Sequence, residues 1–128
     1  MRAAVLVLLV AGCATLEAPA PTEPAPESLP APVLRPENAA VAGLMQSARA
    51  ETDAGRLGNA AASLERALRI EPRNPRLWHE LARIRLKQGD YAQAENVAAR
   101  SNTWAGGDRE LRAANLRLIE EARAARRR

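Results

Sequence analysis

A repeat with a period of 34 residues constrains the fold of this chain more than any other feature of its sequence. When Val41 is aligned with Pro75, similar residues fall opposite one another at four pairs of positions: Ala48 and Ala82, Gly55 and Gly89, Leu57 and Tyr91, Ala60 and Ala94. A period of this length is typical of helical arrays in which each unit packs only against its neighbours. We therefore expect two helix–turn–helix units, at residues 41–74 and 75–108.

Glycine and proline divide each unit into two helices. Gly55 and Gly89 stand where the first helix of each unit ends, and glycine tolerates the positive φ that a tight turn requires there. Pro72 and Pro75 separate the first unit from the second. In the second helix, a packing stripe is expected from Ala60, Leu64 and Ala67. The predicted helices span residues 41–54, 57–71, 75–88 and 91–101.

The second unit departs from the repeat at its end. Polar Ser101-Asn102 and the pair Gly106-Gly107 predict that the fourth helix ends at residue 101 and that residues 102–107 form a loop closing over Trp104. We expect Asp108 to cap a last helix over residues 109–126. Its predicted apolar stripe holds Leu111, Ala114, Leu118 and Ala122, with Leu116 and Ile119 beside it. A helix of this kind covers the end face that two repeats leave open.

The composition agrees with closely packed helices and excludes several other kinds of protein. The chain has two Trp, one Tyr and no Phe, so its core must come from Ala, Leu, Val and Ile, whereas a sheet sandwich needs more β-branched and aromatic residues. A single cysteine cannot form an internal disulfide. With only one histidine as well, we expect neither a metal site nor a cofactor.

The N-terminus resembles the signal of a bacterial lipoprotein. A short basic start is followed by an apolar run over residues 3–11 and then by Ala11-Gly12 before Cys13. The run is about half the roughly 20 residues that a membrane-spanning helix needs. The resemblance implies that residues 1–12 are removed and that Cys13 is acylated, and Ala14 after it favours the outer membrane, with the protein facing the periplasm. The alternative is an ordinary signal peptide with an incidental cysteine.

The segment that follows Cys13 has the composition of a tether. Seven of the nine prolines lie between Pro19 and Pro36, and proline disfavours both helix and central strand. We therefore expect residues 13–40 to be disordered. Residues 14–40 carry one Arg and four Glu, a net charge of −3, whereas residues 41–128 carry 17 basic and 11 acidic side chains, or +6. The basic excess thus belongs to the predicted domain.

The two units together resemble the tetratricopeptide repeat family. The second unit carries Trp78, Leu81, Ala82, Gly89, Tyr91 and Ala94, and the first supplies Ala60, Leu64, Ala67 and Pro72. The resemblance implies an all-α fold of two tetratricopeptide helix–turn–helix repeats and a C-terminal capping helix, a fragment of a right-handed α-solenoid. It also implies that the first helices of the repeats line a concave face along which a partner peptide lies.

The concave positions of the family predict a partner-binding groove in this chain. These positions hold Met45, Arg49, Thr52, Arg76, His79, Arg83 and Lys87. The last four recur at intervals of three and four residues, so they share one side of their helix, opposite Leu77, Leu81 and Ile84. An acidic partner segment would be attracted to them because arginine binds a carboxylate with two parallel hydrogen bonds. Alternatively, they are only the solvated face of an arginine-rich helix.

No catalytic motif accompanies this groove. The sequence has no Gly-rich loop before Lys-Ser or Lys-Thr, no nucleophile elbow and no Glu-x-x-His pair. His79 has no Ser, Cys or Asp partner at a fixed spacing, so we interpret it as a groove-lining or exposed histidine. The basic tail at Arg123 and residues 126–128 is interpreted as solvated surface. We expect a binding module that is not an enzyme.

The order of lipoprotein signal, proline-rich tether and two repeats with a closing helix resembles the LpoP family of outer-membrane lipoproteins. That resemblance implies a protein partner, a class A penicillin-binding protein that synthesises peptidoglycan, which the domain would activate by docking on a non-catalytic part of it. Two alternatives stay open. One is a structural scaffold or pilotin-like subunit of an envelope assembly, and the other is binding of anionic wall or lipopolysaccharide. An export signal excludes nucleic acid as the partner.

Overall fold

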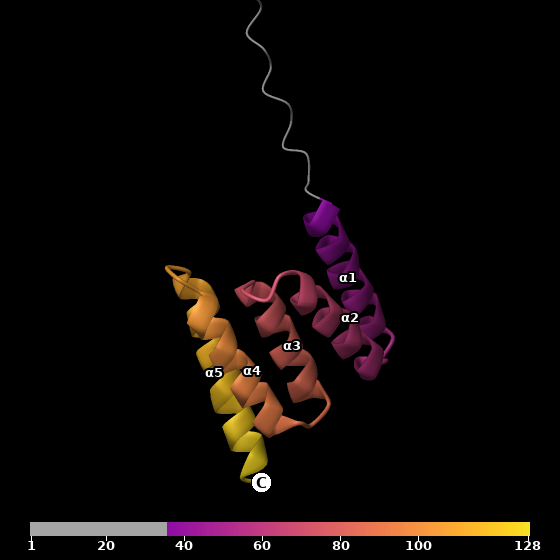
Figure 1. The fold of residues 1–128 in the computed structure, drawn as a ribbon. Helices are drawn as coiled ribbons and strands as arrows, with labels where there is room; N and C mark the ends of the chain where they lie inside the picture. The colour runs from indigo at the N-terminus through magenta and orange to yellow at the C-terminus, as the bar shows by residue number, and fades with distance from the viewer. Residues whose placement is uncertain (1–35) are drawn as a thin grey trace, which may run out of the picture. The chain divides into compact units, whose positions relative to one another are not determined.

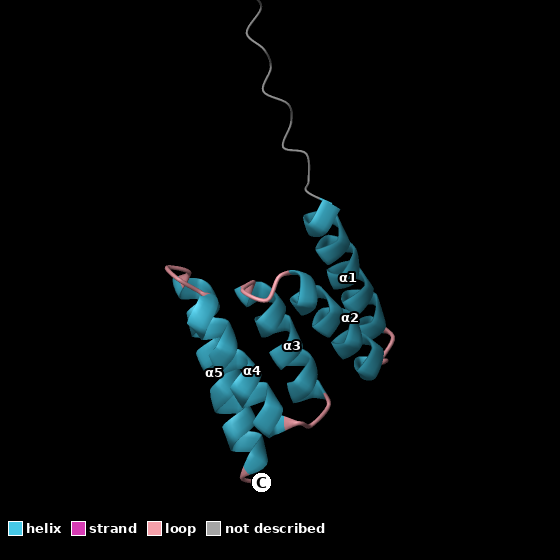
Figure 2. Cartoon of the chain, viewed as in Figure 1, coloured by secondary structure: helices cyan, strands magenta, loops and turns pink. Residues whose placement is uncertain are grey.

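The computed structural model describes residues 36–128, and in this range the chain forms five α-helices (Figure 1). The helices are α1 (Pro36–Asp53), α2 (Leu57–Ile70), α3 (Pro75–Lys87), α4 (Tyr91–Trp104) and α5 (Arg109–Arg126). Within these residues every element is a helix or a connecting turn (Figure 2). The predicted all-α fold is therefore confirmed for this part of the chain. The predicted signal peptide, and the predicted tether as far as residue 35, lie outside the described residues.

The 34-residue period is visible in where the helices begin. α2 and α4 start at Leu57 and Tyr91, and α3 and α5 start at Pro75 and Arg109, so each pair is offset by one repeat. α1 packs against α2, α3 against α4, and α4 against α5, with further contacts between α2 and α3 and between α3 and α5. α5 therefore occupies the place of the first helix of a third repeat.

Small side chains at the repeated positions bring the helices close together. Ala60, Ala82 and Ala94 are fully buried, and Ala48 is nearly so. Leu64 and Ala67 are buried beside Ala60, as the predicted stripe requires. The buried apolar core consists of Ala, Leu, Val and Ile, because the three aromatic residues pack at its edge or stand exposed. The predicted core composition is confirmed.

The turns between helices use the residues that the sequence predicted for them. Gly55 has φ 75° and Gly89 has φ 78°, both in the left-handed region where a side chain would be strained. The carboxylate of Asp108 accepts a hydrogen bond from the backbone N–H of Leu111 at 2.9 Å, which caps α5. Asn74 caps α3 and Asp90 caps α4 in the same way. The chain thus reverses direction between helices with satisfied backbone groups.

Two predicted helix ends differ from the structure. α1 begins at Pro36, five residues before the predicted start at 41, because proline is well suited to the first position of a helix. α4 continues to Trp104 rather than ending at residue 101. Ser101 extends the helix because its hydroxyl finds a buried partner, the carbonyl of Pro75 at 2.8 Å. The predicted loop over Trp104 is wrong, since this side chain remains 41% exposed.

The apolar stripe of α5 also differs from the prediction. Leu118, Ile119 and Ala122 are buried as expected, but Leu116 is 55% exposed. Asn115, its polar neighbour, is fully buried in the contact with α3 and α4. Leu116 lies one repeat after Ala82, at the position where α3 meets its second helix. In α5 that position faces away from the packed helices.

Candidate functional site

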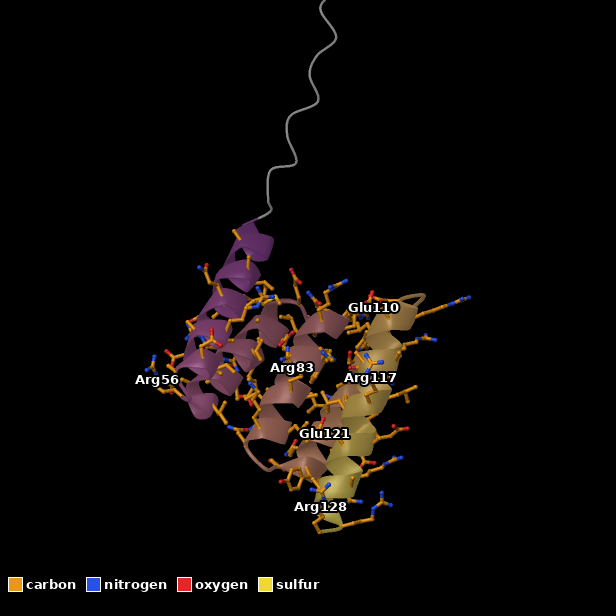
Figure 3. The ribbon with its side chains drawn as sticks, turned by 180° about the vertical axis from the view of Figure 1, so that it is seen from behind. Arg56, Arg83, Glu110, Arg117, Glu121 and Arg128 are labelled. Carbon is orange, nitrogen blue, oxygen red and sulfur yellow. The ribbon has the colours of Figure 1, made fainter. Side chains whose placement is uncertain are left out.

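The first helices α1, α3 and α5 line one side of the array, which we call the concave face (Figure 3). It contains two adjoining hollows of about 290 and 430 Å³. The first lies between α1 and α3, and the second between α3 and α5. Arg83 and Lys87 of α3 line both, so α3 forms the ridge between them. Figure 3 shows Arg83 between α1 and α5.

Six of the seven predicted groove residues line these hollows. Met45, Arg49, Thr52, Arg83 and Lys87 line the first, and His79, Arg83 and Lys87 line the second. The structure therefore brings residues from two repeats onto one surface. Arg76 stands apart from both hollows at the start of α3, where its guanidinium lies 3.6 Å from the carboxylate of Asp108. It links α3 to the cap of α5 instead of lining the groove.

The concave face is less uniformly basic than the sequence indicated. Its lining residues include four basic side chains, Arg49, Arg83, Lys87 and Arg117, and three acidic ones, Asp53, Glu80 and Glu121. The Arg83 guanidinium lies 3.1 Å from the Glu80 carboxylate on the same helix. A partner must therefore match a pattern of both signs, with a small excess of positive charge.

The basic residues on this face follow the repeat. Arg49, Arg83 and Arg117 are spaced 34 residues apart, so they occupy the same position in α1, α3 and α5. Arg49 lines the first hollow, Arg83 lines both and Arg117 lines the second. Their guanidiniums form a row across the array, one for each first helix. We call these three residues the arginine row.

His79 is held in the second hollow by a network of polar side chains. Its Nδ1 atom lies 2.7 Å from Oδ1 of Asn115. The Asn115 amide nitrogen donates to Ser101 Oγ at 2.8 Å and to Asn102 Oδ1 at 2.9 Å. The Ser101 hydroxyl in turn donates to the Pro75 carbonyl. Asn115 and Ser101 are fully buried, so the network ties α3, α4 and α5 together away from water.

The direction of these hydrogen bonds determines the proton position on His79. A backbone carbonyl only accepts, so the Ser101 hydroxyl must donate to Pro75 and accept from the Asn115 amide. The Asn115 oxygen is then left to accept from His79, which must carry its proton on Nδ1 when neutral. The other ring nitrogen, Nε2, becomes a hydrogen-bond acceptor available to the second hollow.

Sequence reasoning missed the contribution of α5 to this face. It treated this helix as a cover, whereas Arg117 and Glu121 line the second hollow and Asn115 orients His79. The signal for Arg117 was present, because it lies one period after Arg83. The burial of Asn115 had no signal in the local pattern of α5.

Two further kinds of site were sought within residues 36–128. These residues contain no group of three or more His, Cys, Asp or Glu side chains placed to bind a metal ion. Among the described helices, none combines the length and the apolar character needed to cross a membrane.

Comparison with known proteins relates this arrangement to others. Residues 51–118, from the end of α1 into α5, match the model of a family described as tetratricopeptide repeat. The chain is also similar to the solved structure of the globular C-terminal domain of LpoP from P. aeruginosa, with a TM-score of 0.66 and 45% sequence identity. The similarity covers 67% of this chain and 81% of that one. No curated protein sequence matches the chain.

Proposed function

Because the chain belongs to the tetratricopeptide repeat family and its helices are of the LpoP type, we propose that it binds an envelope protein through its concave face. The arginine row carries this proposal. A segment that lies across α1, α3 and α5 meets a guanidinium from Arg49, Arg83 and Arg117 in turn. Each can hold a carboxylate with two parallel hydrogen bonds, so the row favours a partner segment with acidic residues.

The partner that the LpoP likeness supports is a class A penicillin-binding protein. In this proposal the domain docks on a non-catalytic part of the synthase and shifts it toward its active state. Such activation requires only a higher affinity for one of two conformations of the synthase, so it needs no catalytic group in this chain. His79 adds selectivity, since its Nε2 atom would accept a hydrogen bond from a donor on the partner.

An anchor places the domain within reach of that partner. In this proposal Cys13 is acylated, and the protein is held in the outer membrane with the domain in the periplasm. Diacylation and N-acylation together give stable attachment, because one acyl chain alone binds a membrane only marginally. The proline-rich residues after Cys13 then form a tether, which at about 3.1 Å per residue could span several tens of ångströms toward the inner membrane.

A binding experiment with two charge reversals tests the docking surface. We would use residues 13–128 with Cys13→Ser and measure affinity for the periplasmic part of a class A penicillin-binding protein from the same organism, at two salt concentrations. Arg83→Glu should weaken binding by well over roughly tenfold, because it replaces an attraction by a repulsion within the groove. Arg127→Glu makes the same change in net charge outside both hollows and should have little effect.

The same experiment separates the alternatives. Equal losses from both reversals that vanish together at high salt would contradict the groove and support binding to an anionic wall or lipopolysaccharide, since that attraction depends on net charge. Binding without stimulation of glycan synthesis would support a scaffold role in an envelope assembly.

A further inference from the structure

A second surface lies on the other side of the array from the concave face. There the second helices α2 and α4, with the turn before α3, enclose two adjoining hollows of about 540 and 600 Å³. Pro72, Trp78, Asn96 and Arg100 line both hollows, and none of their lining residues lines the concave face. In Figure 1 α4 lies in front of α5, whereas in the reverse view of Figure 3 α5 lies in front.

Two arginine–tryptophan stacks mark this surface, which we call the Arg–Trp face. The Arg100 guanidinium lies 5.0 Å from the ring centre of Trp78, and the Arg73 guanidinium lies 5.3 Å from that of Trp104. Each stack joins residues from different elements: Arg100 is on α4 and Trp78 on α3, while Arg73 precedes α3 and Trp104 ends α4. Stacking uses the flat side of a guanidinium and leaves its N–H edge free to bind a planar anion.

The charge on the Arg–Trp face is not neutralised by neighbouring side chains. Arg69, Arg73 and Arg100 make no ion pair with any side chain in the described range. The one acidic residue that lines these hollows, Glu65, already binds the guanidinium of Arg85. The surface therefore presents three guanidiniums and favours a ligand with carboxylates.

The apolar part of the face is fixed in place yet accessible. The indole N–H of Trp78 donates to the Pro72 carbonyl at 2.8 Å, which holds this ring against the turn before α3. Trp104 is 41% exposed, and its indole N–H donates to no group within residues 36–128. Exposed tryptophan and arginine are the residues that contribute most at protein interfaces.

We propose that the Arg–Trp face is a second docking surface, which binds an extended peptide segment bearing carboxylates. The apolar part of the segment would lie on Trp78, Pro72 and Trp104, and its carboxylates would reach the edges of the stacked guanidiniums. A peptide fits better than a lipid surface because the guanidiniums are folded onto rings beside hollows and do not protrude as an array. The two faces share no lining residue, so the domain can hold segments at both at once.

The two tryptophans allow a direct test, since each gives one indole N–H signal in a proton–nitrogen spectrum. The probes are a ten-residue peptide of alternating Glu and Pro, its counterpart with Gln for Glu, and vesicles of phosphatidylglycerol. The protein is residues 13–128 with Cys13→Ser. We expect the Glu peptide to shift both indole signals in a saturable way. Arg73→Gln with Arg100→Gln should weaken this binding roughly tenfold, as the loss of two charge-assisted contacts predicts.

Matched variants keep this test independent of the proposed function. Arg123→Gln with Arg127→Gln removes the same charge from α5 and should leave peptide affinity unchanged. Arg83→Glu should also leave it unchanged, because Arg83 lines only the concave face. Unmoved indole signals, or equal shifts with the Gln peptide, would overturn the proposal. Shifts with the vesicles alone would overturn it in favour of a lipid-binding surface.

Discussion

The Nδ1 atom of His79 lies 2.7 Å from the Oδ1 atom of Asn115, and this contact connects the concave face to the buried side of α5. The two residues are 36 positions apart in the chain. Because Asn115 also donates to Ser101 and Asn102, its amide cannot turn over without losing three hydrogen bonds. The orientation of a groove residue is therefore set by the packing of the last two helices.

The tautomer of His79 is the first prediction. At a pH above its titration, nitrogen NMR of the imidazole should show the proton on Nδ1, because Asn115 Oδ1 can only accept. Asn115→Leu removes that acceptor and should move the population toward the Nε2–H form. A wild-type ring protonated on Nε2 would show that the amide of Asn115 points the other way.

The close approach of α3 to its neighbours is the second. Ala82 is fully buried, so Ala82→Leu should overpack the contact and lower the free energy of unfolding by about 1–3 kcal/mol. Gln93→Leu adds an apolar side chain at an exposed position of α4 and should cost much less. Denaturant unfolding of both variants checks this, and equal losses would mean that the helix faces are misassigned.

The arginine row gives a third prediction. If the partner segment crosses all three first helices, Arg49→Glu and Arg117→Glu should each weaken its binding by roughly tenfold, at opposite ends of the concave face. Arg56→Glu, in the turn after α1 and outside both hollows, is the control. An effect of Arg49→Glu without one of Arg117→Glu would limit the partner to the first hollow.

The ion pairs between α4 and α5 predict a pH dependence. A hydrogen bond from Arg123 lowers the pKa of Glu95, and the charges of Arg123 and Arg126 lower it further. The folded state thus favours ionised Glu95. Its contribution to stability is present above the unfolded pKa of about 4.3 and is lost as the pH falls through the lower folded value.

Thermal unfolding at pH 7 and pH 3 should show this directly. Glu95→Gln should lower the melting temperature at pH 7, and its difference from wild type should shrink at pH 3. Glu120→Gln on α5 serves as the control, since Glu120 makes no ion pair within residues 36–128. A difference for Glu95→Gln that stays constant with pH would contradict the assignment.

The predicted acylation of Cys13 is the fifth. Cys13→Ser should release the protein from membranes while leaving its helices folded, because the residue lies outside the five-helix unit. Membrane flotation after a salt wash, with circular dichroism of the released protein, measures both. A Cys13→Ser protein that still floats with membranes would contradict the lipoprotein interpretation.

The repeat made most of the fold predictable, and its failures have a common cause. Each packing position of the first unit recurs 34 residues later, so Ala60, Ala82 and Gly89 could be assigned before any coordinates. Ser101 and Asn102 were expected to end a helix because they interrupt an apolar stripe. They continue it because Asn115, distant in sequence, satisfies them in the interior. Local patterns do not report such long-range partners.

The concave face divides in the same way. The residues of α1 and α3 could be placed because the repeat assigns their helix faces, and six of seven line the hollows. Arg76 departs because Asp108, at the start of α5, lies near enough to pair with it. The acidic lining residues Asp53, Glu80 and Glu121 went unnoticed because the sequence analysis considered the stripe of basic residues by itself.

The exposed Leu116 has a consequence for the modular growth of the array. Ala82 allows a second helix to lie close to α3, but the equivalent position of α5 carries a leucine. A second helix stacked on α5 in the register of the repeat would collide with that side chain. Leu116 thus acts as a terminator of stacking, and grafting a further repeat onto α5 would first require Leu116→Ala.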